Sequence, residues 1–369
     1  RSRYQFQSAY PVNSLILSCC MKFEAVTIKD IAKALGLSTS TVSRALRDSY
    51  EISPETKKQV LEYAQKINYR PNPIALSLKE KRSHSIGIVV SEIANNFFSQ
   101  VINGIESIAY DRGYNVVITQ SHESYHRELS NVQYLASRSV DGLLISVSAE
   151  TQDLQHLQGL HEKGLPIVFF DRVVENIETH KVTIDNARGA FDATHYLLQQ
   201  GYQQVAALMN AEYLSITRER LAGYKNAMNK NGLSFDPDLV QYCRHGGLDY
   251  EEVEQALDQL FSQQKRPDAI FGGSDTLTTN CLRYLKAHNI CMPEDIGFIG
   301  FSNIDLSELL SPSLSVVRQP AFEIGKLATS LLLELIESKR PVKTFNTQVL
   351  SPSLLIGESS QRIKKAKKL

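Results

Sequence analysis

From Ser85 to about residue 310, short apolar runs alternate with stretches whose apolar residues recur at helical spacing. Strands that alternate with helices at this spacing predict parallel sheets covered by helices on both faces. Two such series follow one another, over 84–184 and 185–310, so we expect two similar α/β lobes. The runs are Ile86–Val90, Val116–Thr119, Gly142–Ile145, Ile167–Phe170, Val182–Ile184, Val205–Met209, Ala269–Phe271 and Ile296–Gly300.

Residues 27–67 have a purely helical pattern that fits three short helices. Ser38 is the expected N-cap of the second helix, and Ser53 precedes a proline at the first turn of the third. Gly36 permits a tight bend between the first two helices, which small and apolar side chains would hold together. This arrangement is typical of a helix-turn-helix, whose second helix enters the major groove of DNA with its N-terminal residues first.

Charge is unevenly distributed, although the formal net charge of the 369 residues is zero. Residues 21–83 carry 12 Lys/Arg and 7 Asp/Glu, whereas residues 84–360 have 12 more acidic than basic side chains. The last nine residues carry five basic side chains and no acidic one. A basic head on an acidic body indicates that the head binds a polyanion. The alternative is that the charges are clustered by chance.

Several classes of function find no support in the sequence. No run approaches the ~18 apolar residues of a membrane helix. The five cysteines have no metal-ligand spacing, so we expect free thiols in a reducing cytoplasm. Glycine-rich nucleotide motifs, HExxH and GxSxG are absent from the sequence, and the nine histidines are scattered. We therefore expect no catalysis, no metal, no cofactor and no membrane partner.

The first twenty residues do not fit the pattern of the rest. The run Leu15-Ile16-Leu17-Ser18-Cys19 faintly resembles a lipoprotein processing site, but its apolar core is short for a signal peptide. Met21 is a natural start, followed at once by the helical pattern. We interpret 1–20 as an upstream extension or an artefact. The alternative is an exported two-lobed sugar-binding protein, against which the complete head between signal and body argues.

A family resemblance rests on segments that occur in a fixed order. They are TIKDIAKALGLSTSTVSRAL and INYRPNPIALSLKEKRS, then IGIVV, NNFFSQVINGIE, VDGLL, FFDR, TIDN, RERLAGY, GGSDTL, IGFIGFSN and LSVVRQP. With these, residues 25–357 resemble the lac repressor family of bacterial transcription regulators. The resemblance implies an α/β fold with an all-helical helix-turn-helix head. It also implies a two-lobed, periplasmic-binding-protein-like core of parallel sheets, with three crossovers between lobes and the third near Val317–Ala321.

The resemblance assigns DNA contacts to the head. It implies that Thr39, Ser40 and Arg44 read bases, and arginine is the usual bidentate partner of guanine O6 and N7. Leu78, in a hinge helix, would wedge into the minor groove, or else serve as a plain dimer contact. Phosphate contacts fix register without reading sequence, although any one such hydroxyl could instead be a helix cap. The implied phosphate contacts are Thr27, Ser38, Thr41, Ser53, Thr56 and Asn72.

The resemblance also places a small ligand in the cleft of the body. Arg220 is the arginine expected to bind effector hydroxyls or a carboxylate. Ser274 and Ser302 stand where many sugar-binding members have Asn and Asp, which puts a lac-like sugar pose in doubt. Leu248 falls near the position of a stacking aromatic. The expected effector-binding residues are Phe97, Phe98, Arg220, Ser274, Asp275, Ser302 and Gln319, with lobe core as the alternative for the two phenylalanines.

These inferences predict a cytoplasmic regulator, and a repressor in particular. Its expected partners are double-stranded operator DNA, a sugar-like small-molecule effector and a second copy in a homodimer. The expected parts are an upstream segment (1–20), a DNA-binding head (25–70), a hinge helix (71–83), an effector-binding and dimerisation core (84–357) and a basic tail (358–369). The alternative that keeps the head is a DNA-binding regulator whose ligand pocket has no function.

Overall fold

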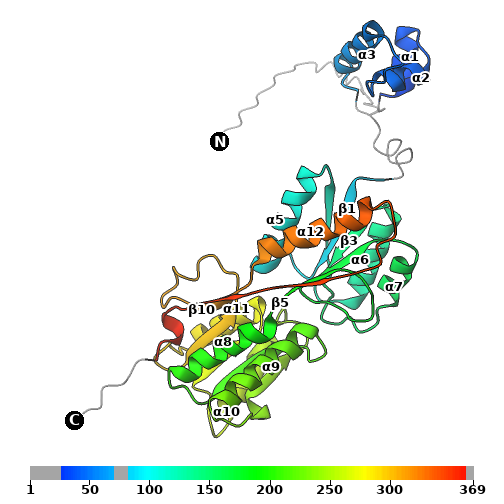
Figure 1. Cartoon of the computed structure of the whole chain (residues 1–369). Helices are drawn as coiled ribbons and strands as arrows, with labels where there is room; N and C mark the ends of the chain where they lie inside the picture. The colour runs from blue at the N-terminus through cyan, green and yellow to red at the C-terminus, as the bar shows by residue number, and fades with distance from the viewer. Residues whose placement is uncertain (1–25, 70–81, 363–369) are drawn as a thin grey trace, which may run out of the picture. The chain divides into compact units, whose positions relative to one another are not determined.

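The computed structural model describes residues 26–69 and 82–362. The chain forms two compact units, with the boundary between Lys79 and Glu80. We call the first unit the head and the second the body, and Figure 1 shows their elements.

The head is a bundle of three helices, α1 (Ile28–Leu35), α2 (Thr39–Ala45) and α3 (Pro54–Lys66). Gly36 ends α1 in the left-handed conformation, at φ 67°, and donates its N–H to the carbonyl of Ala32. Glycine adopts this conformation without the steric cost that a Cβ would add, so the tight bend predicted at this position is confirmed. The head core consists of Ile31, Ala32, Val42, Ala45, Val60 and Ala64.

The body contains two six-stranded sheets, each flanked by helices. The predicted α/β class is therefore confirmed. The first sheet has the order β11-β5-β4-β3-β1-β2, with every pair parallel. We call this sheet and its helices lobe 1. Its strands are β1 (Ser85–Val90), β2 (Asn115–Gln120), β3 (Gly142–Ile145), β4 (Ile167–Phe170), β5 (Lys181–Ile184) and β11 (Thr347–Leu350).

Helices cover both faces of the lobe 1 sheet. One face packs against α5 and α12, and the other against α6 and α7. Close packing depends on small residues: a Cβ at Gly104 of α5 would lie 2.0 Å from the Phe322 carbonyl oxygen of α12. The helices are α5 (Asn96–Asp111), α6 (Tyr125–Ser137), α7 (Gln155–Glu162) and α12 (Ala321–Glu337).

Lobe 2 repeats this plan, with strand order β12-β10-β9-β8-β6-β7 and one antiparallel pair, β10–β12. Helices α8 and α9 lie on one face, and α10 and α11 on the other. Its strands are β6 (Val205–Asn210), β7 (Val240–Cys243), β8 (Ala269–Gly272), β9 (Gly297–Phe301), β10 (Ser315–Arg318) and β12 (Ser353–Leu355). Its helices are α8 (Asn186–Gln199), α9 (Ser215–Lys230), α10 (Tyr250–Ser262) and α11 (Asp275–Ala287), with 3-10 turns at Pro237–Leu239 and Glu358–Ser360.

The strand-helix pattern predicted two lobes that follow one another in sequence, and this prediction is wrong. After β10 the chain returns to lobe 1, where it adds α12 and β11, and it then re-enters lobe 2 as β12. The three crossovers lie at 184–186, 318–321 and 350–353. The segment at Val317–Ala321 is therefore the second crossover and not the third. The added strands escaped prediction because β11 alternates between exposed and half-buried residues, and β12 is only three residues long.

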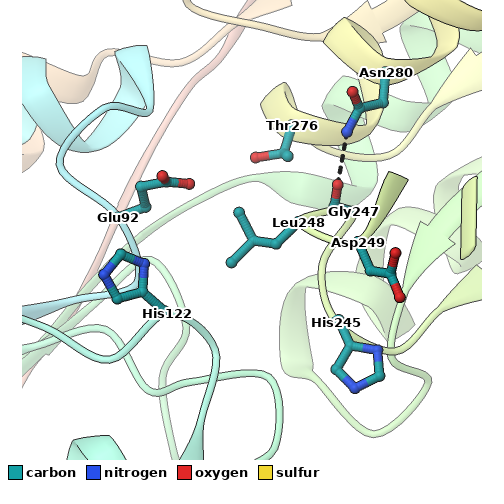
Figure 2. Close-up of a pocket in the computed structure, with 8 residues that line it drawn as sticks. All are labelled: Glu92, His122, His245, Gly247, Leu248, Asp249, Thr276 and Asn280. Atoms are coloured by element: carbon teal, nitrogen blue, oxygen red, sulfur yellow. Dashed lines mark hydrogen bonds between the residues drawn. The ribbon is translucent and has the colours of Figure 1, made fainter. Parts of the chain in front are cut away.

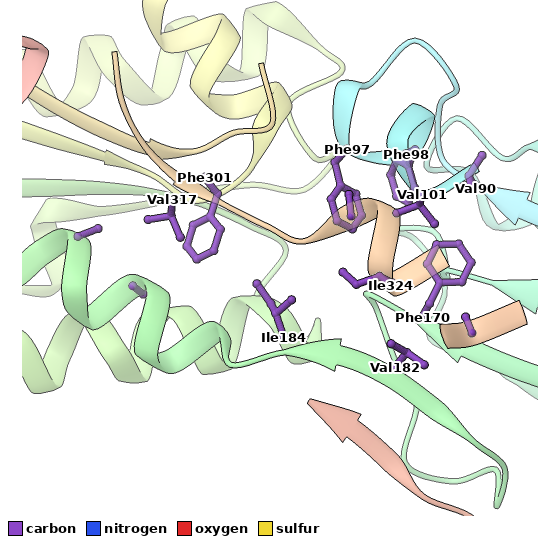
Figure 3. Close-up of a cluster of buried hydrophobic side chains, with 14 of the residues drawn as sticks. Val90, Phe97, Phe98, Val101, Phe170, Val182, Ile184, Phe301, Val317 and Ile324 are labelled. Carbon is purple, nitrogen blue, oxygen red and sulfur yellow. The ribbon is translucent and has the colours of Figure 1, made fainter. Parts of the chain in front are cut away.

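One buried apolar cluster contains residues of both lobes. It includes Phe170 and Ile184 of lobe 1 together with Phe301 and Val317 of lobe 2, as Figure 3 shows. The two lobes therefore share core packing at their joint, and any change in their relative orientation has to rearrange these side chains. In the described parts of the chain, no helix has the length and apolar character that crossing a bilayer requires.

Candidate functional site: an interlobe cavity and a helix-turn-helix face

The N-terminus of α2 carries a network of short polar side chains. The Ser38 hydroxyl accepts a 3.1 Å hydrogen bond from the Thr41 N–H, which confirms the predicted N-cap. The same oxygen lies 2.8 Å from both the Ser40 and the Thr41 hydroxyls. Thr39, Ser40 and Arg44 are exposed on this helix. The structure therefore presents all three residues predicted to read bases, while the Ser40 hydroxyl is already engaged by the cap.

The other predicted phosphate contacts of the head sit at helix starts. Thr27 precedes α1, and its N–H and hydroxyl both donate to Asp30 Oδ2 at 2.8 Å. These bonds hold the pKa of Asp30 below its ordinary value. Ser53 caps α3 by accepting from the Thr56 N–H at 3.2 Å. Capping is thus established for Ser38 and Ser53, and contact with phosphate remains a prediction. Asn72 and Leu78 lie outside the described residues.

The body encloses a cavity of about 30 Å³ between its lobes. Six of the seven predicted effector-binding residues line it: Phe97, Phe98, Arg220, Ser274, Asp275 and Gln319. They come from the start of α5 in lobe 1, from α9 and α11 in lobe 2, and from the second crossover. The sequence therefore identified residues that lie far apart in the chain and that the fold brings to one wall.

Arg220 is bound to both of the first two crossover segments. Its Nε donates to Asn186 Oδ1 at 2.8 Å, and its Nη2 donates to Gln319 Oε1 at 3.2 Å. Its Nη1 donates to the Gly273 carbonyl at 2.6 Å, and the guanidinium carbon lies 3.8 Å from the centre of the Phe301 ring. Burial lowers the pKa of Arg220 to about 10. The side chain remains cationic at neutral pH and joins the cavity to the hinge.

Asp275 is held by the segment that follows β9. The Ser302 hydroxyl donates to Asp275 Oδ1 at 2.6 Å, and the Asn303 N–H donates to the same atom at 3.1 Å. Burial raises the pKa of Asp275, and these hydrogen bonds oppose the shift. Ser302 is itself fully buried and absent from the cavity wall, so its predicted direct contact with an effector needs correction. Its hydroxyl fixes the carboxylate that does reach the cavity.

The remaining predicted residues combine packing with access to the cavity. Phe97 and Phe98 are 4% and 3% exposed and meet edge to face, with ring centres 5.2 Å apart. They belong to the apolar cluster and also line the cavity, so their place in the lobe core is established and their contact with an effector stays a prediction. Ser274 caps α11 and donates to Asn210 Oδ1 at 3.2 Å.

A buried ion pair at the cavity was not predicted. Arg172 Nη2 donates to Glu123 Oε1 at 2.8 Å, and both residues line the cavity beside Asp171. Burial lowers the pKa of Arg172, but Glu123 more than offsets this and the pKa is raised. Burial likewise raises the pKa of Asp171, against the attraction of Arg172. The available signal was the FFDR segment, in which two charged residues directly follow a buried strand.

A larger chamber of about 600 Å³ opens beside this cavity, and Figure 2 shows its lining side chains. Glu92 and His122 come from lobe 1, whereas Leu248 and Asn280 come from lobe 2. Thr276 lines both the chamber and the inner cavity. Leu248, expected near a stacking position, is therefore part of the wall. The two spaces are adjoining parts of one interlobe site.

Polar contacts hold the lobes together at this site. Asn95 Nδ2 of lobe 1 donates to Thr276 Oγ1 of lobe 2 at 3.1 Å. Gln100 of α5 accepts from Asn303 Nδ2 at 2.8 Å and donates to Asp305 Oδ1 at 3.1 Å. These neutral or exposed contacts are individually weak, so a ligand could alter them at small cost. Among the described residues, no group of three His, Cys, Asp or Glu side chains could hold a metal ion.

A head of the helix-turn-helix type, joined in one chain to a two-lobed body with a polar interlobe cavity, defines a ligand-responsive DNA-binding regulator. Residues 27–72 match the family model for bacterial regulatory proteins of the lacI family. Residues 83–356 match the model for periplasmic binding proteins and the sugar-binding domain of the LacI family. The chain therefore belongs to the lacI family of bacterial transcription regulators, as its sequence predicted.

Individual relatives match most of the chain. The transcriptional repressor PurR of Vibrio cholerae is 34% identical over 313 residues, covering 85% of this chain and 92% of its own. The transcriptional repressor CytR of Escherichia coli is 33% identical over 316 residues, covering 85% and 91%. The structure of the regulator CelR with cellobiose is 28% identical, with a TM-score of 0.66, and covers 90% of this chain and 99% of its own.

Proposed function

We propose that this protein is a cytoplasmic transcription repressor whose affinity for operator DNA is set by a small polar ligand bound between the lobes. The observation that carries this proposal is the position of Arg220, which lines the cavity and bonds to Asn186 and Gln319 on two crossovers. A ligand that withdraws one of these hydrogen bonds acts directly on the segments that set the angle between lobes. Ligand binding and DNA binding are then coupled, typically by ~1–3 kcal/mol, and the coupling is reciprocal.

In the head, Arg44 reads guanine through paired hydrogen bonds, and Thr39 and Ser40 contact neighbouring base edges. The exposure of all three on α2 supports this assignment. Phosphate contacts by Thr27, Ser38, Thr41, Ser53, Thr56 and Asn72, and minor-groove insertion by Leu78, complete the proposed interface. The repressor names of the relatives support repression as the outcome.

The ligand is proposed to be a sugar or sugar derivative, held by Arg220, Asp275 and Gln319 against the edges of Phe97 and Phe98. The wall offers cationic, carboxylate and amide groups beside aromatic rings, which suits a ring with several hydroxyls. The cellobiose complex of a 28% identical regulator supports the same class. Ser274 supports the ligand through Asn210, and Ser302 through Asp275.

The working unit is proposed to be a homodimer, because two heads on a two-fold axis match a near-palindromic operator. Leu306, Leu309 and Leu310 of one body loop are exposed, as are Val117 and Ile118 on the edge strand β2. Exposed apolar side chains at two places on the body support contact with a second copy of the chain. Sedimentation equilibrium of the full chain is expected to give twice the monomer mass, and a monomer at micromolar concentration would contradict this part.

A second candidate is a regulator that binds DNA without a ligand. The inner cavity of about 30 Å³ has room for roughly one water molecule, which favours this candidate. For a sugar to enter this inner cavity, the side chains around Arg172 and Arg220 have to move, or the lobes have to separate.

One experiment separates the two candidates. Bound sequences are first selected from randomised duplex DNA, and affinity for the selected site is then measured with cellobiose, ribose, nucleosides and phosphorylated sugars. A ligand-gated repressor changes its DNA affinity about 5- to 150-fold with one compound. The Arg220→Ala variant is expected to keep DNA binding and lose this response. DNA affinity that no compound changes would favour the ligand-independent candidate, and absence of any selected site would contradict the proposal.

A further inference from the structure

The base-reading arginine proposed above forms an ion pair within the head. Arg44 Nη1 lies 3.0 Å from Glu51 Oε2, and the two side chains are 51% and 46% exposed. Among the described residues, Arg44 has no other ion-pair partner at this distance. Glu51 belongs to the turn between α2 and α3 and has no role in the helix-turn-helix pattern. The pair therefore brings a carboxylate to the face that meets DNA.

The turn that carries Glu51 is hydrogen-bonded to the backbone of Arg44. The Ser49 N–H donates to the Arg44 carbonyl at 3.1 Å, so the chain folds back on the end of α2. The Ser49 hydroxyl then accepts from the Glu51 N–H at 3.4 Å, and the Ser49 carbonyl accepts from Ile52 at 3.2 Å. These hydrogen bonds through Ser49 link the backbone at residue 44 to the backbone at residue 51, so the turn holds Glu51 beside the end of α2.

An ion pair and a hydrogen bond join the same turn to α3. Asp48 lies in the left-handed region, at φ 54°, where a residue with a side chain is uncommon. Lys57 Nζ donates to the Asp48 carbonyl at 3.2 Å and to Asp48 Oδ1 at 2.6 Å. This clamp ties the turn to the third helix at a point three residues before Glu51. The carboxylate thus sits on a turn held at both sides, and not on a loose loop.

The geometry leaves most of the arginine available to a base. A guanidinium has five N–H donors in a planar fork, and the ion pair engages Nη1. Among the residues that the structure describes, its remaining edge, made of Nε and Nη2, has no partner and can form the two hydrogen bonds that guanine O6 and N7 accept. A carboxylate on one edge therefore does not exclude guanine from the other. An arginine side chain loses rotamer freedom when a base orders it, and an ion-pair partner already in place reduces that entropic cost.

We propose that Glu51 is a positioning residue that sets the sequence specificity of this regulator by holding Arg44 for guanine. The inference rests on the proposed reading of guanine by Arg44. Glu51 acts in two ways. It orders the guanidinium before DNA arrives, and its charge offsets attraction of Arg44 to phosphate, which is the same for every sequence. Both effects increase the ratio of operator affinity to random-DNA affinity.

The test is a double-mutant cycle on the full-length protein, with Glu51→Gln, Arg44→Ala and the double variant. Dissociation constants are measured for the selected operator and for a scrambled duplex of equal length, at several salt concentrations. We expect Glu51→Gln to lower the specificity ratio about two- to fivefold, the range that an exposed ion pair supports. Arg44→Ala lowers it about 5- to 150-fold, and adding Glu51→Gln to Arg44→Ala changes the ratio no further.

Glu62→Gln is the matched control, because it removes the same charge from the head while its carboxylate pairs with Lys58 at 4.0 Å. The control is expected to tighten scrambled-DNA binding slightly and to keep the specificity ratio. Amide hydrogen exchange of α2 checks that Glu51→Gln leaves the helix folded.

The possible results separate cleanly. An unchanged ratio in Glu51→Gln, with a lowered ratio in Arg44→Ala, overturns the positioning role. The positioning role is also overturned if adding Glu51→Gln to Arg44→Ala lowers the specificity ratio further, because Glu51 then contacts a base directly. An unchanged ratio in Arg44→Ala itself contradicts the proposed base reading instead. Only a loss that requires Arg44 supports the inference.

Discussion

The two polar sites of this protein are built from contacts of very different range. On the head, the Ser38 hydroxyl bonds to Thr41, three residues further along the chain, and these side chains remain exposed or half-buried. In the body, Arg220 bonds to residues 34, 53 and 99 positions away, and it is 2% exposed. The head face is thus a local surface that a short sequence specifies. The cavity is a tertiary construction whose charges are balanced by distant partners.

This contrast predicts how each site responds to change. Substitutions on the exposed face should alter DNA recognition while leaving the fold intact. Substitutions in the cavity should alter recognition and stability together, since a buried group left without its partner is costly.

The largest expected effect is that of Arg172→Ala in the cavity. Removing the guanidinium leaves Glu123 buried without its cation, which is expected to cost about 3–5 kcal/mol in the free energy of unfolding of the body. Because the chain has no tryptophan, urea unfolding is monitored by far-ultraviolet circular dichroism, which measures the change in the free energy of unfolding. The double variant Glu123→Leu/Arg172→Met is the control and should recover most of the loss. A cost below about 1 kcal/mol for Arg172→Ala would show that this pair is effectively solvated.

Arg44→Ala is expected to have the next largest effect, on recognition alone. Loss of a bidentate guanine contact removes about 1–3 kcal/mol of discrimination between operator and random DNA. Because the side chain is half exposed and its ion pair with Glu51 lies at the surface, stability should change by less than about 0.5 kcal/mol. Operator titration and thermal unfolding give the two numbers. A marked loss of stability would contradict the separation of recognition from folding on the head.

Ser38→Ala tests the overlap between capping and DNA contact. Loss of the N-cap should destabilise α2 by about 1 kcal/mol, which amounts to roughly fivefold faster exchange of its protected amides. Ser38→Asp keeps a capping oxygen and should preserve exchange protection, while its added negative charge weakens DNA binding. If Ser38→Asp binds DNA as tightly as the wild type, Ser38 does not contact phosphate.

The smallest expected effect concerns the acid sensitivity of α1. Hydrogen bonds from Thr27 lower the pKa of Asp30 in the folded head, so the carboxylate stabilises the fold above the unfolded pKa of about 3.9. This contribution is lost as the pH falls through the lower, folded pKa. Exchange protection of α1 should therefore decline below about pH 4 in the wild type and stay flatter in Asp30→Asn. Identical pH profiles in the two proteins would exclude a role for this carboxylate.

The sequence anticipated most of the head and much of the body. Ser38 and Ser53 were identified as caps because capping depends on residue type and on position relative to an apolar pattern. Buried strands such as β3 and β4 were found because each is a continuous apolar run, whereas the buried strand β10 and the partly buried strand β7 were missed. By contrast, the family resemblance implied three crossovers between the lobes, but the apolar runs did not identify β11, since a half-exposed edge strand has a weak pattern.

The cavity was anticipated only in part. The family resemblance identified Arg220 and Asp275, which line it, but it also placed Ser302 on a wall that this residue does not reach. Neither the Glu123–Arg172 pair nor the Arg44–Glu51 pair was foreseen, because an ion pair depends on two side chains meeting at the correct distance. Residue spacing along the chain carries little of that information when a turn or a sheet edge intervenes.

By itself, then, the sequence determined the helix-turn-helix head, the alternation of strands and helices, and the family to which the chain belongs. These properties follow from local periodicity, from capping and turn residues, and from motifs read in order. Only the tertiary structure decided which lobe receives α12 and β11, and how Arg220 connects the cavity with two crossovers. The physical reason is that such contacts depend on parallel pairing and packing between segments up to a hundred or more residues apart, which no local pattern encodes.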